Sequence, residues 1–339
     1  MAHQTRLGGF KLLNDVVWIS LVEPDGDRGF PAGFCHLLAG ERINFLFLTC
    51  GNRESVWGLD IVADPDNASK ALKLIKGNFA KTNHETMKGS VLSLFPHKSD
   101  PEITAALLNV FGKEGIEPNA LAYSNSAISA VLREEIVDKA TKSLFEPFSF
   151  SAYRTPADWK LAQKGKEQLY KEVVASYQEK QPKVYALEWQ DGQELLRLRL
   201  NWQDLGVMGN VLRDFSGQGR VFSFLLSNPS NETKTANLSF CLPESGSQES
   251  TNIIRELLPE ALTDRISPVA VFSMNGPHFG DRYGIASELL TAFDKARVDL
   301  LALSCSIHSI NGVVPTGQDD SAIQAIQACF EVPSVIRKP

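Results

Sequence analysis

The order in which apolar runs and turns recur constrains this chain more than any single motif. Four successive segments share one order: strand, turn, helix, strand, strand, helix. In the first segment, residues 16–22 form an apolar run of strand length, and a turn rich in proline, aspartate and glycine follows. In the second half, leucine and arginine alternate through residues 195–200 before the same order returns. The pattern predicts repeated units of mixed α and β structure.

The spacing inside the segments supports this interpretation. Fourteen residues separate the turn residue Gly29 from Ile43, at the head of the predicted second strand, and fourteen separate Gly284 from Val298. The second segment has the same spacing, and the third is one residue longer. The repeat therefore extends along the whole chain.

We expect the fold class to be α+β, with four modules in two pairs. The predicted modules are residues 6–80, 86–150, 183–262 and 263–339, with a helical linker at 151–182. We interpret the linker as a solvated connecting helix with one packed stripe, and a partner-binding helix is the alternative.

Each half also begins with one strand more than its two units need. Residues 7–13 precede Asn14-Asp15, and residues 183–189 precede Gln190-Asp191-Gly192, which is a hairpin signal. We expect these strands to cross over and pair with the open edges of the second and fourth units. An uncovered edge would invite aggregation.

Composition and charge argue against several classes of function. Lysine and arginine number 34 and aspartate and glutamate 40, so a net charge of −6 disfavours nucleic acid or an anionic membrane as a partner. No apolar run reaches the length of a membrane span, and the N-terminus lacks the apolar core of a signal peptide. The five cysteines lie in apolar runs, which is typical of buried free thiols in a reducing cytoplasm.

Catalytic and metal-binding signatures are missing. The sequence contains no GxxxxGK[ST], HExxH, GxSxG or GxGxxG, and its six histidines have no ligand spacing. We therefore expect no cofactor, no metal site and no enzymatic activity.

Several short motifs, in this order, resemble the ACT domain family, in particular the paired regulatory ACT domains of aspartokinases. Leu-Gly-Gly-Phe at 7–10 precedes a strand, and Asp-Arg-Gly at 27–29 and Ile-Asn at 43–44 are similar to the family's D-P-G and I-N. Residues 303–310 resemble I-S-T-S-E-x-x-I, and residues 322–326 resemble the closing helix. Nothing resembles the aspartokinase catalytic domain. The second segment lacks the turn glycine, which argues against ligand binding there. Only the first and fourth segments have the full set of polar turn residues, so we expect the second and third to be mainly structural.

The resemblance implies four ferredoxin-like βαββαβ modules, with helices packed on antiparallel sheets. It also implies that a small ligand binds between paired units, near the first turn and first helix. Backbone N–H groups at the helix start would hold a carboxylate, and an Asp or Asn side chain would hold the ammonium group. The first and fourth segments share Gly-Asp-Arg at 26–28 and 280–282. The predicted ligand-binding residues are Asp25, Gly26, Asp27, Arg28, Gly29, Asn44, His278, Phe279, Gly280, Asp281, Arg282, Gly284, Asp299 and Ser304.

The resemblance favours a non-catalytic, cytoplasmic amino-acid sensor, with a homodimer or an enzyme as possible partners. One alternative is an interaction subunit that modulates an aspartokinase-type enzyme without its own ligand. Another is a repressor-like regulator akin to the two-ACT glycine-cleavage regulators, which residues 280–285 resemble. The sequence does not name the ligand. Lysine and threonine both fit, and so does a purely structural role without a ligand.

Overall fold

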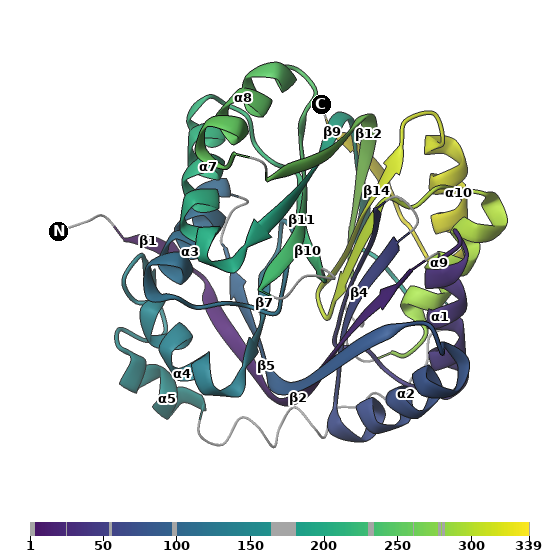
Figure 1. Cartoon of the computed structure of the whole chain (residues 1–339), viewed down its shortest axis with the longest axis horizontal. Helices are drawn as coiled ribbons and strands as arrows, with labels where there is room; N and C mark the ends of the chain where they lie inside the picture. The colour runs from purple at the N-terminus through teal and green to yellow at the C-terminus, as the bar shows by residue number, and fades with distance from the viewer. Residues whose placement is uncertain are drawn as a thin grey trace.

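The computed structural model describes residues 4–24, 26–53, 56–96, 100–163, 181–229, 234–259, 261–276, 279 and 282–338. It is a mixed α/β structure with one large sheet and helices on its outer faces, in agreement with the predicted α+β class (Figure 1).

The elements of the two halves follow similar orders. The first half contains β1 (Thr5–Leu7), β2 (Gly9–Glu23), α1 (Phe30–Gly40), β3 (Phe47–Arg53), β4 (Val56–Ala63), α2 (Pro65–Asn78), β5 (Asn83–Phe95), α3 (Pro101–Glu114), β6 (Ala120–Tyr123), β7 (Ile128–Arg133), α4 (Glu134–Ser143), β8 (Phe148–Phe150) and α5 (Pro156–Gln163). The second half contains β9 (Ala186–Asn201), the 3-10 turn η1 (Trp202–Asp204), α7 (Leu205–Gly217), β10 (Phe224–Pro229), β11 (Thr235–Pro243), α8 (Ser247–Leu257), β12 (Leu262–Asn275), α9 (Ile285–Ala296), β13 (Ala302–Ser306), β14 (Ser309–Pro315), α10 (Asp319–Cys329) and β15 (Val335–Lys338).

The described strands other than β1 and β8 form one continuous sheet. Its order is β11-β10-β6-β7-β5-β2-β4-β3-β13-β14-β12-β9-β15. Since β9 also pairs with β11, every strand of this sheet except β15 belongs to a closed ring. Figure 1 shows α1, α2, α9 and α10 on one outer side of the strands, and α3, α4, α7 and α8 on the other. Two apolar clusters lie under these helix groups, and two smaller ones lie between facing strands.

Long strands join the two sides of the ring. β2 and β5 pair along most of their length, but β2 pairs with β4 through residues 17–23 and β5 pairs with β7 through residues 89–94. Residues 9–13 of β2 pair with 91–95 of β5, and residues 186–190 of β9 pair with 271–275 of β12. The sequence predicts these same pairings, of residues 7–13 with the second unit and of residues 183–189 with the fourth.

Helices α2 and α3 each begin at an Asp-Pro pair. The Asp64 side chain accepts a hydrogen bond from the Asn67 backbone N–H at 2.9 Å, before α2. Asp100 accepts one from the Glu102 backbone N–H at 2.9 Å, before α3. The proline that follows each cap needs no partner for a missing N–H.

The predicted second strands start three or four residues too early. Ile43, Ile116 and Val298 are buried but precede β3, β6 and β13 instead of opening them. Each follows a residue with positive φ, and its N–H donates to a carbonyl in the last turn of the preceding helix. This is the Schellman arrangement, in which an apolar residue after the helix packs back on it. An apolar residue in this place looks the same in sequence as the first residue of a buried strand.

The predicted hairpin at residues 190–192 is wrong. β9 runs without reversal from Ala186 to Asn201, and its pairing with β12 shifts register between Ile266 and Val271 instead. Gly192 has φ of +64°, and in β2 Asp15 has φ of +54° beside a register shift between Leu13 and Val16. Positive φ within a paired strand produces a bulge that bends the strand.

The described part of the linker is packed against the first half. Trp159 of α5 is buried and stacks on Phe10 with ring centroids 4.7 Å apart. The Tyr153 hydroxyl accepts a hydrogen bond from the Phe10 backbone N–H at 2.8 Å. Residues 164–180 of the predicted linker lie outside the described residues.

Helices α3 and α7 meet through glycines. A Cβ added to Gly112 would lie 2.3 Å from the backbone nitrogen of Gly206, and one added to Gly209 would lie 2.7 Å from the Ala105 carbonyl oxygen. No side chain fits between two backbones that are this close. The contact leaves no room for a ligand where these residues meet.

A buried carboxyl lies between the facing strands. Asp60 of β4 is fully buried and accepts hydrogen bonds from Trp18 Nε1 at 3.0 Å and Thr49 Oγ1 at 3.3 Å. The one proton of the Thr49 hydroxyl is shared with the Ser227 carbonyl oxygen, which lies 2.9 Å from Oγ1, and this contact ties β3 to β10. Burial raises the pKa of Asp60 well above its usual value, because the site disfavours the charged form.

We predict that Gly112→Ala lowers the free energy of unfolding by about 1–3 kcal/mol, because α3 and α7 must move apart to admit the methyl group. Gly77→Ala is the matched control. Gly77 lies on α2 with open space at its Cβ position, so the change should be neutral or stabilise by up to about 1 kcal/mol. Equal effects of the two substitutions in urea unfolding would contradict the close packing.

We also predict that Asp60 makes stability depend on pH. Its raised pKa means that the folded protein keeps a proton that the unfolded chain loses near pH 4, so stability falls as the pH rises from about 4 toward neutrality. Asp60→Asn should flatten this dependence, and Asp66→Asn, at an exposed position, should not. Urea unfolding across that range measures both, and an unchanged slope in Asp60→Asn would contradict the prediction.

Candidate functional site

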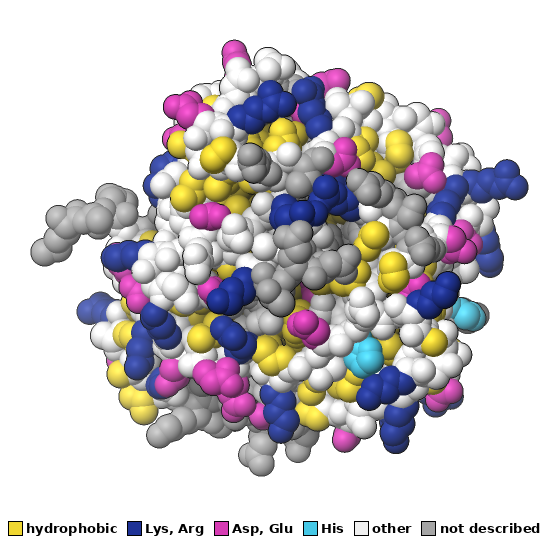
Figure 2. Space-filling model, viewed as in Figure 1, with side chains coloured by type: hydrophobic (Ala, Val, Ile, Leu, Met, Phe, Trp, Pro, Cys, Tyr) yellow, Lys and Arg dark blue, Asp and Glu magenta, His cyan; other side chains and the backbone are white. Residues whose placement is uncertain are grey.

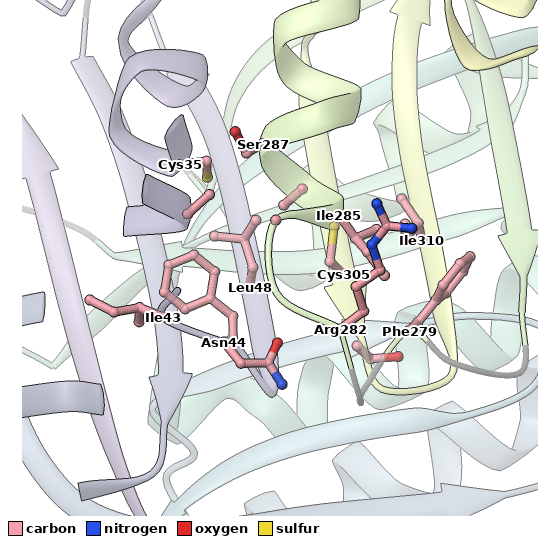
Figure 3. A pocket seen from close by; sticks show the side chains of 15 residues that line it. Cys35, Ile43, Asn44, Leu48, Phe279, Arg282, Ile285, Ser287, Cys305 and Ile310 are labelled. Atoms are coloured by element: carbon pink, nitrogen blue, oxygen red, sulfur yellow. The ribbon is translucent and has the colours of Figure 1, made fainter. Parts of the chain in front are cut away.

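The candidate site is a pocket between the first and fourth segments (Figure 3). It lies where the C-terminal half of α1 and the loop after it meet the start of α9 and strands β13 and β14, and it encloses about 450 Å³ including its open mouth. Ile43, Leu48, Ile285 and Ile310 supply much of its apolar wall. The enclosed cavity itself has a volume of only about 30 Å³, well below that of a typical small-molecule site, so a ligand here would also occupy the open mouth.

The start of α9 supplies backbone donors to this pocket. Gly284 has φ of +87° and precedes the first helical residue, Ile285, and no side chain caps the helix. The first helical hydrogen bond to the Gly284 carbonyl comes from the Glu288 N–H at 2.8 Å. The amides of residues 285–287 therefore lie at the pocket without a capping side chain. Such groups bind carboxylates and other anions.

Two polar side chains add to these donors. Arg282 comes from the loop before α9, and its guanidinium donates to Glu288 Oε1 at 2.6 Å. Asn44 comes from the loop after α1, on the other side of the pocket. Figure 3 shows Asn44 on the side of Ile43 and Leu48, and Arg282 and Phe279 on the opposite side near Ile310. A guanidinium and a side-chain amide thus reach the pocket from segments that are far apart in the sequence.

The structure brings together only some of the predicted ligand-binding residues. Four of them line the pocket: Asn44, Phe279, Arg282 and Gly284. Four lie outside the described residues: Asp25, His278, Gly280 and Asp281. The others are elsewhere: Gly26, Asp27, Arg28 and Gly29 at the start of α1, Asp299 after the end of α9, and Ser304 within β13.

Ser304 is on the face of the sheet opposite the pocket. It is buried, and it pairs across the sheet with Thr49, which points between the facing strands. Its neighbour Cys305 lines the pocket instead. Successive side chains of a strand alternate between faces, so one strand position separates these two environments.

The turn at residues 26–29 is filled by protein side chains. A Cβ at Gly26 would lie 2.6 Å from Cδ1 of Trp57, and the Trp57 indole donates to the Asp27 carbonyl oxygen at 2.9 Å. Arg28 forms an ion pair with Asp299 at 3.1 Å. The predicted anion-binding arginine and the predicted ammonium-binding aspartate therefore bind each other.

Sequence reasoning missed most of the pocket wall. Cys35 and Ala39 of α1 line the pocket, but in sequence they look like ordinary core residues of an amphipathic helix. Burial raises the pKa of the Cys35 thiol to about 12 and raises that of Cys305 as well. Both are neutral thiols at physiological pH and contribute packing surface.

We also searched the described part of the chain for metal sites, membrane-spanning helices and patches of one charge. No group of three or more His, Cys, Asp or Glu side chains there could hold a metal ion. None of its helices combines the length and the apolar character needed to cross a membrane. On the face in Figure 2, basic and acidic side chains are interspersed rather than gathered by sign.

Comparison with known proteins gives structural matches alone. No protein-family model and no curated protein sequence matches this chain. The aspartate kinase from Synechocystis shares 13% identity over 96% of this chain and 56% of that chain, with a TM-score of 0.77. This chain thus spans a little over half the length of that kinase. At this identity the match establishes a shared fold.

Two further matches are shorter. The regulatory subunit of aspartate kinase from Thermus thermophilus shares 15% identity over 45% of this chain and all of that chain, with a TM-score of 0.37. Aspartate kinase from Clostridium acetobutylicum shares 17% identity over 46% of this chain and 37% of that chain, with a TM-score of 0.38. These TM-scores are too low to carry an argument.

The expectation that this chain is not an enzyme is contradicted by the first match. The solved structure that matches 96% of the chain is an aspartate kinase, which is a catalytic protein. The missing motifs on which the expectation rested are signatures of other enzyme classes, so their absence does not exclude a relation to an enzyme.

We predict that the pocket thiols react slowly despite lining a pocket. With a pKa of about 12, Cys35 should be alkylated by iodoacetamide at pH 8 about 1,000-fold more slowly than a free thiol, because the thiolate is the nucleophile. Mass spectrometry of the native protein measures this, and the same protein in denaturant is the control. Labelling of Cys35 or Cys305 at the rate of a free thiol would contradict the raised pKa values.

Proposed function

We propose that this chain is an amino-acid-binding regulatory unit tied to an aspartate kinase, built from four ACT modules in two pairs. The modules are those delimited above: residues 6–80, 86–150, 183–262 and 263–339. The first and fourth modules form the binding pair, and the second and third form a structural pair. The fold shared with an aspartate kinase over 96% of the chain supports the regulatory context.

The pocket between α1 and α9 is the observation that carries this proposal. Its residues offer complementary partners to both charged ends of an amino acid. The amides at the start of α9, with Arg282, suit the carboxylate, and the side-chain oxygen of Asn44 suits the ammonium group. A guanidinium has five N–H donors, so Arg282 can hold a carboxylate while it contacts Glu288.

The pair formed by the first and fourth modules leaves space for a ligand between its helices, and the pair formed by the second and third modules does not. At the first pair, a Cβ at Gly284 would lie 3.7 Å from the Ala39 Cβ, an ordinary contact beside an open pocket. At the second pair, Gly112 and Gly206 bring the backbones of α3 and α7 into direct contact. Ligand binding is therefore assigned to the first pair, where it would bridge the two halves of the chain and shift their relative stability.

Isothermal titration of the full chain against the standard L-amino acids tests the proposal. We expect one or a few amino acids to bind at millimolar concentration or better. Arg282→Gln should weaken binding about 10- to 100-fold, the usual effect of losing a hydrogen bond to a charged group. Arg213→Gln is the matched control, since Arg213 pairs with Glu102 at 3.1 Å on α7, outside the pocket.

The outcomes separate the two main hypotheses. Silence across the panel in a folded protein would contradict amino-acid binding. If such a protein still changed the activity of an aspartate kinase, it would act as an interaction subunit without its own ligand. Equal binding by Arg282→Gln and wild type would remove the pocket from the proposal.

A further inference from the structure

Arg282 carries the one charge at the pocket among the described residues that line it. Its side chain is 23% exposed, and its guanidinium donates to Glu288 Oε1 at 2.6 Å. In Figure 3 the Arg282 side chain reaches toward Ile285 and Ile310, beside the start of α9. The positive charge that would draw a ligand carboxylate into the pocket is thus already paired with a carboxylate of the protein.

Glu288 lies outside this pocket, in the first turn of α9. It lines a separate groove between α9 and α10, together with Thr291 of α9 and Cys329 of α10. Burial and the nearby Glu288 carboxylate raise the pKa of Cys329 to about 12. Since Glu288 does not line the pocket, it can act on a ligand there only through Arg282 and through its charge.

The Arg282–Glu288 pair has no net charge, which favours one kind of ligand over another. A zwitterion brings an ammonium group that Glu288 attracts and a carboxylate that it repels, so the two effects largely cancel. A plain carboxylate anion brings only the repelled group. Glu288 also offsets the positive end of the α9 dipole, which would otherwise attract any anion.

A first-turn glutamate can also have a purely structural role, because a negative charge near a helix start stabilises the helix dipole without any ligand. Glu102 is in the first turn of α3 and pairs with Arg213 at 3.1 Å, outside the pocket. It provides the matched comparison for Glu288, since both are first-turn glutamates that pair with an arginine.

We propose that Glu288 is a positioning residue that makes the pocket at the start of α9 accept zwitterions and reject carboxylate anions of the same shape. It acts through Arg282, whose guanidinium it holds at the pocket and whose charge it neutralises. The inference rests on the proposed function and narrows its ligand to molecules that carry both a carboxylate and an ammonium group. The excluded ligands are α-hydroxy acids, α-keto acids and inorganic anions.

Isothermal titration of the full chain tests this inference with two sets of probes: the L-amino acids that have uncharged side chains, and the α-hydroxy acids with the same side chains. Wild type should bind an amino acid at least about 10-fold more tightly than its α-hydroxy analogue. Glu288→Gln should reduce this ratio about 10-fold, mainly by tightening the α-hydroxy acid, because the carboxylate that repels it is gone.

Two further variants separate the effect of charge from the effect of helix stability. Glu102→Gln removes a first-turn charge and an arginine pair outside the pocket, and it should leave the ratio unchanged. Glu288→Asp keeps the negative charge and should keep the ratio within about 3-fold of wild type. Thermal melting of each variant reports whether it is folded. A purely structural role of Glu288 would change both affinities by the same factor, which would overturn the inference.

The outcomes distinguish this inference from the proposed function. If wild type binds an amino acid and folded Glu288→Gln has the same ratio, selection by charge is overturned and the proposed function stands. If no variant binds an amino acid but Glu288→Gln binds an α-hydroxy acid that wild type does not bind, the proposed function is overturned and selection by charge is supported. Silence in every folded variant would overturn both.

Discussion

The antiparallel pairing of β3 with β13 is the contact on which the candidate site depends. It joins strands from the first and last parts of the chain and places Thr49 opposite Ser304. Because side chains alternate along a strand, this register directs Leu48 and Cys305 toward the helices and Thr49 and Ser304 toward the facing strands. A shift of one residue would turn the pocket wall inward and the polar residues outward. The register thus determines both the pocket and the buried network around Asp60.

Much of the architecture could be predicted from the sequence, because the signals for it are local. Asp-Pro pairs start α2 and α3, and the repeated order of apolar runs places most helices and strands. The predictions were wrong where the same kind of residue is found in two different local structures. Apolar residues such as Ile43 close a helix but look like the start of a strand. Gly192 bends a strand but looks like a reversal. Those choices depend on pairing with distant segments, which local sequence does not encode.

The candidate site was predictable only in part for the same reason. Gly284 and Arg282 stand in a recognisable turn, and Asn44 follows an apolar residue at a fixed distance from the first turn. The turn at Gly26 carries a similar sequence signal but is covered by Trp57, which arrives from β4. A local motif can indicate that a turn could bind a ligand. Whether another side chain already fills that turn is decided by tertiary packing.

The strands that serve both sides of the ring limit how the protein can move. β2 and β5 pair through both halves of their length, so sliding one along the other would break the alternation of buried and exposed side chains on both sides at once. The bulges near Asp15 and Gly192 lie where the strands pass from one side to the other. We therefore expect the two helix layers to move relative to each other mainly by bending of the strands at these bulges. Because each long strand is continuous through both sides, a tilt of the helix layer on one side would also tilt the strand segments on the other.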